Sequence, residues 1–288
     1  MRKLRPFEYF KPSLLNEALQ ILDHYGEAGC ILAGGTDLLV GLKHRKSRSP
    51  DAVVDLKGIA SLDHFTWTAG NGFRVGALFT VAAVTRDAEI HQRLGMLRTA
   101  ALAIGHPQVR SRATVAGNLC NGSPAADMAP SLLALDARVK IARAGGERTV
   151  PLSEFYEGPF KTILKPGEIV IEIEAPARPA RTAGHYAWFP KANAADETLA
   201  GAAAVVSLEN GQVIREVRIA LGSMAPVPMR APKAEEFLRG QKMEPSLVRE
   251  AARIAASETS PRRRAEYREE MAVLLLQRSL NQAVQLAG

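Results

Sequence analysis

Two glycine-rich stretches hold the residues best suited to binding a ligand. The longer one, residues 112–127, contains two glycines, two asparagines, a threonine, a serine and Asp127. Glycine lets the backbone approach a ligand closely. Short polar side chains offer hydrogen-bond donors, and Asp127 can accept from a ribose-type hydroxyl. Long loops without a function are uncommon, but composition alone leaves a plain surface loop and a cradle for an anionic, hydroxyl-rich ligand as equal alternatives.

The second stretch is the turn Ala33-Gly34-Gly35-Thr36-Asp37. A strand-like run at residues 30–33 precedes the two glycines, and a helical pattern opens at Leu38. A strand, a glycine turn and a helix start together point backbone N–H groups at a phosphate. A Gly-Gly pair alone indicates only a turn. The turn lacks the Gly-Lys-Ser/Thr of a P-loop and the Gly-x-Gly-x-x-Gly of a dinucleotide fingerprint.

Taken together, the two stretches resemble the FAD-binding subunits of the molybdenum hydroxylases, which include xanthine dehydrogenases and aerobic-type carbon monoxide dehydrogenases. Residues 33–37 match the family's first turn, and residues 108–118 followed by 123–127 match its second motif. Ala116 stands where the family usually has glycine. Its methyl group is expected to shift the segment or to require a negative φ. The resemblance covers most of the chain, including the C-terminal third.

The resemblance implies an α+β fold of the PCMH/vanillyl-alcohol-oxidase type. Two lobes, residues 1–57 and 58–176, would grip FAD, and a C-terminal α+β domain with a small antiparallel sheet would follow at residues 177–288. The implied cofactor-binding residues are Leu32, Ala33, Gly34, Gly35, Thr36, Asp37, Leu38, Ile104, Gly105, Val109, Ala113, Thr114, Ala116, Gly117, Asn118, Cys120, Asn121, Ser123, Asp127, Ile169, Val170 and Lys191.

Some of these residues have an equally ordinary reading. Lys191 follows Phe189 and could stabilise negative charge on the reduced flavin ring, or it could be a surface lysine. Ile169 and Val170 match positions that cover the flavin in relatives, although such residues are usually core. The resemblance implies non-covalent FAD, because Cys120 and His106 do not match attachment positions. No catalytic residue and no metal ligand is expected in this chain.

The resemblance also implies partners: a large molybdopterin subunit and a small subunit with two iron–sulfur clusters, arranged as a dimer of heterotrimers. Substrate would be oxidised at molybdenum, and this chain would pass electrons from the clusters to NAD, a quinone or a ferredoxin. One alternative is a free-standing FAD oxidoreductase, which needs a base that the sequence does not show. Another is a scaffold subunit without flavin, for which Ala116 would be the first sign.

Composition agrees with a redox subunit. The chain has 288 residues, 47% of them hydrophobic, which suffices for two domains. Its two cysteines, Cys30 and Cys120, are too few for an iron–sulfur cluster and indicate a reducing compartment. The basic N-terminus lacks the apolar core of a secretory signal, and no apolar run approaches a membrane span. We therefore expect a cytoplasmic protein.

The net charge of +7 permits nucleic-acid binding. Only residues 262–264 form a dense basic cluster, and no aromatic residues alternate with them, so a solvated face or a contact to an acidic partner subunit is the better interpretation. The six histidines show no His-x-x-x-His spacing and the cysteines no Cys-x-x-Cys, which argues against a metal site.

Local patterns predict the elements that position these stretches. Ser13 is the expected N-cap of a helix that ends at Gly26, and Thr80 that of a helix from Val81. Further helices are expected around residues 94–104, 247–255 and 271–280, and strands at 30–33, 53–56, 73–77, 138–142 and 168–173. A hairpin is predicted from 202–208 and 213–221, with Asn210-Gly211 as a type I′ turn.

Overall fold

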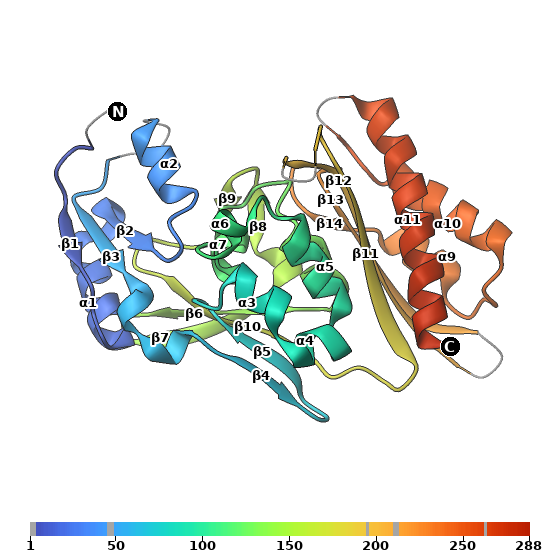
Figure 1. The fold of residues 1–288 in the computed structure, drawn as a ribbon, viewed down its shortest axis with the longest axis horizontal. Helices are drawn as coiled ribbons and strands as arrows, with labels where there is room; N and C mark the ends of the chain where they lie inside the picture. The colour runs from blue at the N-terminus through green and yellow to red at the C-terminus, as the bar shows by residue number, and fades with distance from the viewer. Residues whose placement is uncertain (1–3, 45–48, 194–195, 210–212, 262–263) are drawn as a thin grey trace.

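The computed structural model describes residues 4–44, 49–193, 196–209, 213–261 and 264–288. Among these residues, three larger β-sheets with their helices follow one another along the chain, and a fourth sheet of two strands accompanies the second (Figure 1). The first two sheets form the two N-terminal lobes and the third forms the C-terminal domain. Short 3₁₀ helices connect some elements, at Gly26–Ala28, Leu56–Gly58, Ala60–Leu62 and Leu152–Glu154.

Lobe 1 is a small parallel sheet with strand order β1-β3-β2. Its elements are β1 (Glu8–Phe10), α1 (Leu15–Tyr25), β2 (Gly29–Leu32), α2 (Leu38–Lys43) and β3 (Ala52–Asp55). Helix α1 packs Ala18, Leu19 and Leu22 into the lobe's core, as its 3.6-residue spacing predicts. The expected βαβ-like lobe is confirmed, with β1 as an additional strand that the sequence pattern missed.

The predicted cap of α1 is wrong. The helix begins after Leu14, and the Ser13 hydroxyl caps no N–H group. Instead, the Glu17 carboxylate accepts the backbone N–H groups of Ser13 and Leu14 at 3.1 and 3.2 Å. An acidic side chain in the first turn therefore binds two backbone N–H groups just before the helix, which are not the donors that a serine cap accepts. The cap predicted at Thr80 is confirmed, because its hydroxyl accepts the Ala83 N–H at 3.1 Å.

Lobe 2 is an antiparallel sheet with helices packed on one side (Figure 1). Its strand order is β4-β5-β10-β6-β7, with β4 (Phe65–Thr68), β5 (Gly72–Gly76), β6 (Arg138–Arg143), β7 (Gly146–Pro151) and β10 (Ile169–Ala175). Its helices are α3 (Val81–Arg86), α4 (Ala88–Arg93), α5 (Gly95–Ala103), α6 (Pro107–Arg110), α7 (Val115–Cys120) and α8 (Met128–Ala134). A two-stranded hairpin, β8 (Tyr156–Gly158) and β9 (Lys161–Thr162), completes it.

Helix α7 corrects the sequence analysis, which treated residues 112–127 as one long loop. The Thr114 hydroxyl accepts the Gly117 N–H at 3.0 Å and caps the helix. Val115, Ala116 and Leu119 are buried on its inner face. A capped turn with a buried apolar face is stable within the core despite its asparagine and glycine.

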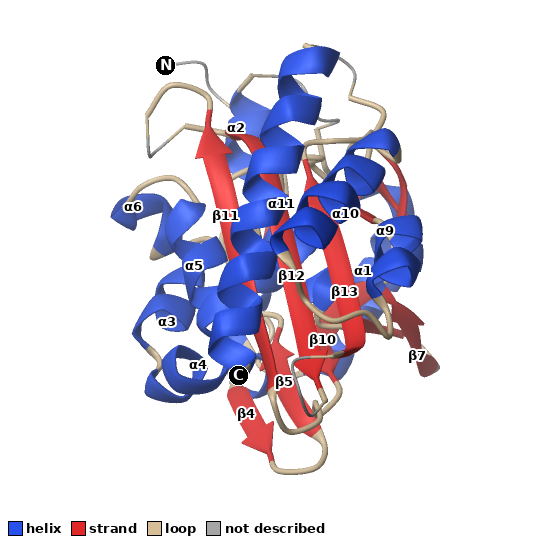
Figure 2. Cartoon of the chain, turned by 90° about the vertical axis from the view of Figure 1, so that its right-hand side faces the viewer, coloured by secondary structure: helices blue, strands red, loops and turns tan. Residues whose placement is uncertain are grey.

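The C-terminal domain is a four-stranded antiparallel sheet with helices on its outer face (Figure 2). It comprises β11 (Thr182–Pro190), β12 (Thr198–Leu208), β13 (Ile214–Gly222), β14 (Met229–Arg230), α9 (Pro232–Leu238), α10 (Pro245–Ser257) and α11 (Ala265–Ala287). The predicted β12–β13 hairpin is confirmed, whereas its turn at Asn210-Gly211 lies outside the described residues, as do Arg262 and Arg263. The helix expected around residues 271–280 is present within α11, although its apolar residue Leu274 is 57% exposed.

The C-terminal sheet packs directly on lobe 2. All residues of β12 are buried, because α11 covers one face of the sheet while α5 and α8 cover the other. Tyr186, Ala203, Val205 and Ala220 belong to the same apolar core as the helices of lobe 2. Within the described ranges, no helix combines the length and apolar character needed to cross a bilayer.

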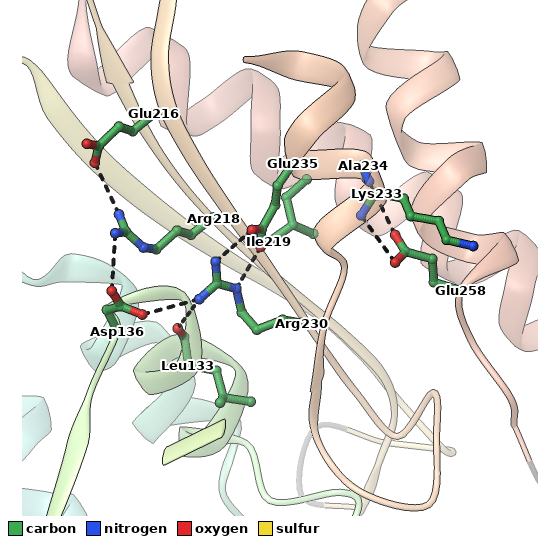
Figure 3. Close-up of polar contacts among 10 residues, drawn as sticks. All are labelled: Leu133, Asp136, Glu216, Arg218, Ile219, Arg230, Lys233, Ala234, Glu235 and Glu258. Carbon is green, nitrogen blue, oxygen red and sulfur yellow. Dashed lines mark hydrogen bonds and ion pairs between the residues drawn. The ribbon is translucent and has the colours of Figure 1, made fainter. Parts of the chain in front are cut away.

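Ion pairs at the edge of this interface fix the two units together (Figure 3). Asp136, just after α8, pairs with Arg218 at 3.1 Å and with Arg230 at 3.4 Å. Arg230 also makes a bidentate pair with Glu235 at 2.6 and 2.7 Å. Two arginines from the C-terminal domain thus share one carboxylate of lobe 2, and the paired geometry restricts how the sheet sits on α8.

Candidate functional site

A cleft of about 1150 Å³ is lined by lobe 1, lobe 2 and the segment that leads into β12. Its volume exceeds the roughly 300–1,000 Å³ of common small-molecule sites. The two glycine-rich stretches meet in it, and Ile169 and Val170 of β10 add an apolar wall. The cleft can therefore take an extended ligand with both polar and flat apolar parts.

The first glycine turn presents free backbone donors to the cleft. Among the described residues, no acceptor pairs with the N–H groups of residues 34–38, all of which line the cleft. Gly35 has φ +78°, which favours glycine and makes the turn sharp. Successive free N–H groups in such a turn form a concave anion site. Asp37 also lines it, and burial raises the pKa of that carboxyl, which disfavours a negative charge there.

Gly34 brings the two stretches together. A Cβ atom on Gly34 would lie 2.1 Å from the carbonyl oxygen of Arg112, which belongs to the second stretch. Because the obstructing atom is backbone, no side-chain rotation could relieve the contact. Glycine at this position is therefore required for packing between the lobes, apart from any ligand.

A lysine orients the first turn from its other side. The Lys57 ammonium donates to the Ala33 carbonyl at 3.0 Å and pairs with Asp55 at 2.6 Å. The Tyr9 hydroxyl also donates to Asp55, at 2.6 Å. Burial opposes ionisation of Asp55, but Lys57 and Tyr9 outweigh it and lower the pKa of its carboxyl. A trans peptide points its C=O and N–H in opposite directions, so this contact turns the Gly34 N–H away from Lys57.

The second stretch uses most of its backbone internally and offers side chains. The Val115 N–H donates to the Phe79 carbonyl at 3.1 Å, and the Gly117 N–H to the Thr114 hydroxyl. The Asn118 side-chain oxygen accepts the Met128 N–H at 3.3 Å, which leaves its amide donors for the cleft. Asn121 and Ser123 also line the cleft. This stretch is suited to a ligand's hydroxyl and carbonyl groups more than to a phosphate.

Ala116 fits its position without strain. It lies inside α7 with a negative φ and is 4% exposed, so the conformation expected for a residue larger than glycine is present. Alanine is also the best helix former. Nothing at this position argues against a ligand in the cleft.

Asp127 is a buried acid in the wall of the cleft. It is 7% exposed and accepts hydrogen bonds from the Tyr186 hydroxyl at 2.9 Å and the Thr198 hydroxyl at 2.6 Å. Burial raises its pKa to about 6, against the opposing effect of the two hydroxyls. Sequence reasoning placed Asp127 in the site but missed its partners, which come from strands β11 and β12 far along the chain.

Cys120 is a thiol rather than a thiolate in this cleft. It lines the cleft, and burial raises its pKa to about 12. Tyr156 lies close by with a buried hydroxyl that has no hydrogen-bond partner, and burial raises the pKa of its phenol. Both groups are neutral at physiological pH, so neither is activated for covalent chemistry.

The structure brings together nearly all the residues implied by the resemblance. Every one of them lines the cleft except Leu32, which lies in β2, and Lys191, which is exposed and donates its backbone N–H to the Glu197 carbonyl. The cleft also has lining residues that the sequence analysis did not select: Ile31, Val40, Gly41, Leu56, Ala77, Ala103, Ala125, Ala126, Phe160, Leu164, Asp196 and Glu197.

Phe160 is the most distinctive of the missed residues. It is 66% exposed, has φ +59° and donates its N–H to the Gly122 carbonyl at 2.8 Å. The only sequence signal was its place next to a Gly-Pro pair. Across the described ranges, no three His, Cys, Asp or Glu residues gather where they could hold a metal ion.

Comparison with known families identifies the cleft. The family model "FAD binding domain in molybdopterin dehydrogenase" matches residues 5–178, more than half of the chain. The chain belongs to this family of flavoprotein subunits. The model "CO dehydrogenase flavoprotein C-terminal domain" matches residues 185–283 of the same flavoprotein subunit.

Relatives and solved structures agree. The flavoprotein subunit is 32% identical to a putative xanthine dehydrogenase FAD-binding subunit of Escherichia coli, with 97% of each chain covered. It is 31% identical to the carbon monoxide dehydrogenase medium chain of Hydrogenophaga pseudoflava, with 96% of each covered. A solved structure of carbon monoxide dehydrogenase from that organism superposes with a TM-score of 0.94 at 30% identity, covering both chains completely.

These findings confirm the predicted family, the α+β fold, FAD as the cofactor and the role as an oxidoreductase subunit. The residues present fit FAD. The first turn of the flavoprotein subunit offers a row of unpaired N–H groups to a pyrophosphate, and the second stretch offers amides and a carboxylate to hydroxyls. Ile104, Ile169 and Val170 supply apolar surface for a flat ring.

Proposed function

We propose that this chain is the electron-transfer subunit of a molybdenum-containing hydroxylase. In this role it receives electrons from the iron–sulfur clusters of a small partner subunit and passes them to an external acceptor such as NAD or a quinone. The row of unpaired N–H groups at residues 34–38, facing the second stretch across the cleft, carries the proposal. It is a site for the pyrophosphate of the family's cofactor.

The chain's own residues hold and shield the cofactor. Backbone donors of the first turn bind the pyrophosphate, and Asn118, Ser123 and Asp127 bind hydroxyl groups. Ile104, Ile169 and Val170 cover the flat ring. Lys191 is exposed and outside the cleft lining, so no charge-stabilising role at the ring is assigned to it. FAD itself supplies an electron carrier that exchanges electrons singly or in pairs.

Substrate oxidation then takes place on another chain. We propose a large molybdopterin subunit and a small iron–sulfur subunit as partners, in a dimer of heterotrimers. Relatives named as medium chains and FAD-binding subunits support this. In the part of the chain that the structure describes, the lack of a metal-ligand cluster and two free cysteines agree with a carrier whose other redox groups lie elsewhere. Free thiols also favour a cytoplasmic location.

FAD binding is non-covalent in this proposal. The Cys120 thiol is protonated, which deprives it of the nucleophilicity that attachment needs. Acid precipitation of the flavin-loaded chain should therefore release all flavin into the supernatant, measured by absorbance. Yellow colour that stays in the washed protein pellet would contradict non-covalent binding.

The subunit role is tested by offering the flavin-loaded chain the substrate of its complex together with an artificial electron-accepting dye. We expect no turnover from the isolated chain and turnover once the molybdenum and iron–sulfur chains are added. Steady turnover from the chain alone would favour a free-standing oxidoreductase. A chain that stays colourless after incubation with FAD would favour a scaffold subunit without flavin.

A further inference from the structure

We propose that Tyr186 and Thr198, two residues of the C-terminal domain, are positioning residues of the FAD cleft, where their hydroxyls hold the Asp127 carboxylate with one oxygen free for the cofactor. The inference rests on the proposed function in that FAD occupies the cleft. It goes beyond that function by making the C-terminal domain part of the binding site. Asp127 belongs to lobe 2, whereas both hydroxyls come from the sheet that packs against it.

The two oxygens of the Asp127 carboxylate differ in their hydrogen bonds. Tyr186 and Thr198 both donate to the same oxygen, Oδ1 of Asp127, at 2.9 and 2.6 Å. No described residue donates to Oδ2. Asp127 lines the cleft, and although the residue is only 7% exposed, its Oδ2 is not among the fully buried unpaired atoms, so a ligand or water in the cleft can donate to it. An acceptor of this kind suits a hydroxyl donor of FAD.

The two hydroxyls are themselves held rigidly. Tyr186 is 1% exposed and its ring lies parallel to that of Trp188, with a centroid distance of 6.2 Å and an interplanar angle of 5°. A Cβ atom on Gly201 would lie 2.5 Å from the Tyr186 hydroxyl oxygen, so glycine leaves the space that this hydroxyl needs. The Ser223 hydroxyl donates to the Thr198 carbonyl at 2.7 Å and fixes the start of β12.

The local charges explain why two donors are needed. Burial disfavours the ionised form of Asp127, and the Glu197 carboxylate disfavours it further. Asp196 lines the same cleft and adds another acidic side chain. Arg268 of α11, the nearby cation, donates instead to the carbonyls of Leu199 and Ser223. Since no cation of a described residue pairs directly with it, the Asp127 carboxylate is stabilised by the two hydroxyls.

The arrangement lowers the stability of the fold above the pKa of Asp127. A carboxyl whose folded pKa is raised, here to about 6, favours folding when protonated, and this contribution is lost as pH rises through the folded value. The ionised form of Asp127 therefore does not stabilise the fold at neutral pH. Its role is instead to accept a hydrogen bond from a ligand group at Oδ2.

The test measures FAD affinity of the full-length apo chain against pH, by quenching of flavin fluorescence from pH 5 to 8.5. In the wild type, affinity should rise with pH through about 6 and then level off, because binding uses the ionised carboxylate. In Thr198→Val and Tyr186→Phe the midpoint should move to higher pH, since each loses a hydrogen bond to the charged form. Affinity at pH 7 should fall roughly tenfold.

Matched variants distinguish a specific effect on the Asp127 carboxylate from a nonspecific loss of folded structure. Thr182→Val removes a hydroxyl that pairs with Ser207 on the same two strands but far from Asp127, and it should leave the midpoint unchanged. Asp127→Asn cannot ionise and should show weak, pH-independent binding over this range. Thr198→Ser keeps the hydroxyl and should show the wild-type midpoint. The comparison of Thr198→Ser with Thr198→Val therefore tests the inference even if Tyr186→Phe fails to fold.

An unmoved midpoint in Thr198→Val and Tyr186→Phe would overturn the inference, even if affinity fell equally at every pH. So would an Asp127→Asn variant that keeps the wild-type pH profile. Failure of the proposed function gives a different result, namely a wild-type chain that binds no FAD at any pH.

Discussion

The two glycine-rich stretches face each other across one cleft but work in different ways. The first turn has free backbone N–H groups at residues 34–38, whereas helix α7 and its cap satisfy most N–H groups of the second. The first turn needs glycine at position 35 for a positive φ and at position 34 for close contact with the Arg112 backbone. The second stretch accepts alanine at position 116, because this residue lies inside helix α7. Glycine content alone therefore does not indicate how a stretch binds, because its role depends on which backbone groups remain unpaired.

The largest effect that this difference predicts is for Gly34→Ala. The new methyl would meet the Arg112 carbonyl oxygen, and backbone cannot move away as a side chain can. We expect a loss of about 3 kcal/mol or more in the free energy of unfolding, the upper end for overpacking, and separation of the two stretches. FAD affinity should fall about 100-fold or more. Thermal unfolding and flavin titration test this, and near-wild-type values in both would refute the close approach.

Gly35→Val should weaken FAD binding about tenfold or more while leaving a folded chain. A positive φ costs a branched residue about 1–2 kcal/mol, so the backbone would move away from this conformation and rotate the N–H groups of the turn. Gly70→Val is a matched control, since Gly70 also has a positive φ, of +81°, but lies in the turn between β4 and β5 with open space around it. Both variants should lose stability through the positive φ, Gly35→Val somewhat more because its Cβ atom would lie 2.8 Å from the Leu32 side chain. Only Gly35→Val should lose FAD. Equal flavin affinities would show that the turn is not the phosphate site.

Lys57→Met removes the contact that orients the Ala33 peptide. Losing one hydrogen bond of this kind should weaken FAD binding about threefold to tenfold. Thermal stability should fall as well, because the buried Asp55 carboxylate loses its ion-pair partner. Lys140→Met removes a lysine paired with Glu147 at 2.6 Å on the β6–β7 edge, which is not part of the cleft, and serves as the comparison. If both variants bind FAD equally well, the lysine does not orient the turn.

Ala116→Gly restores the family's usual glycine and should have the smallest effect. Glycine inside a helix costs about 0.5–1 kcal/mol relative to alanine, so the midpoint of thermal unfolding should fall slightly. FAD affinity should stay within about twofold, because the helix already has the conformation it needs. A marked gain in affinity would instead show that the Ala116 methyl restricts the cleft.

Much of the site was accessible from local sequence because its chemistry is local. Gly35 and Thr114 act through turn and cap geometry within a few residues, and short-range patterns report such geometry. Helix α7 was missed because its asparagine and glycine resemble a loop, and the burial of Val115 and Leu119, which stabilises it together with the Thr114 cap, depends on tertiary packing. Ser13 was predicted as the cap because serine is typical of N-caps, but the helix begins one residue later than this cap requires, after Leu14.

The sequence of this chain was sufficient to predict its family, its α+β class, FAD, and the two stretches that line the cleft, because each motif consists of residues close together along the chain. The tertiary structure decided that Gly34 contacts Arg112, that Lys57 turns the Ala33 peptide, and that Tyr186 and Thr198 hold Asp127. Those contacts join residues separated by tens of positions. Their geometry follows from how lobes and sheets pack together, which local patterns of residue type do not encode.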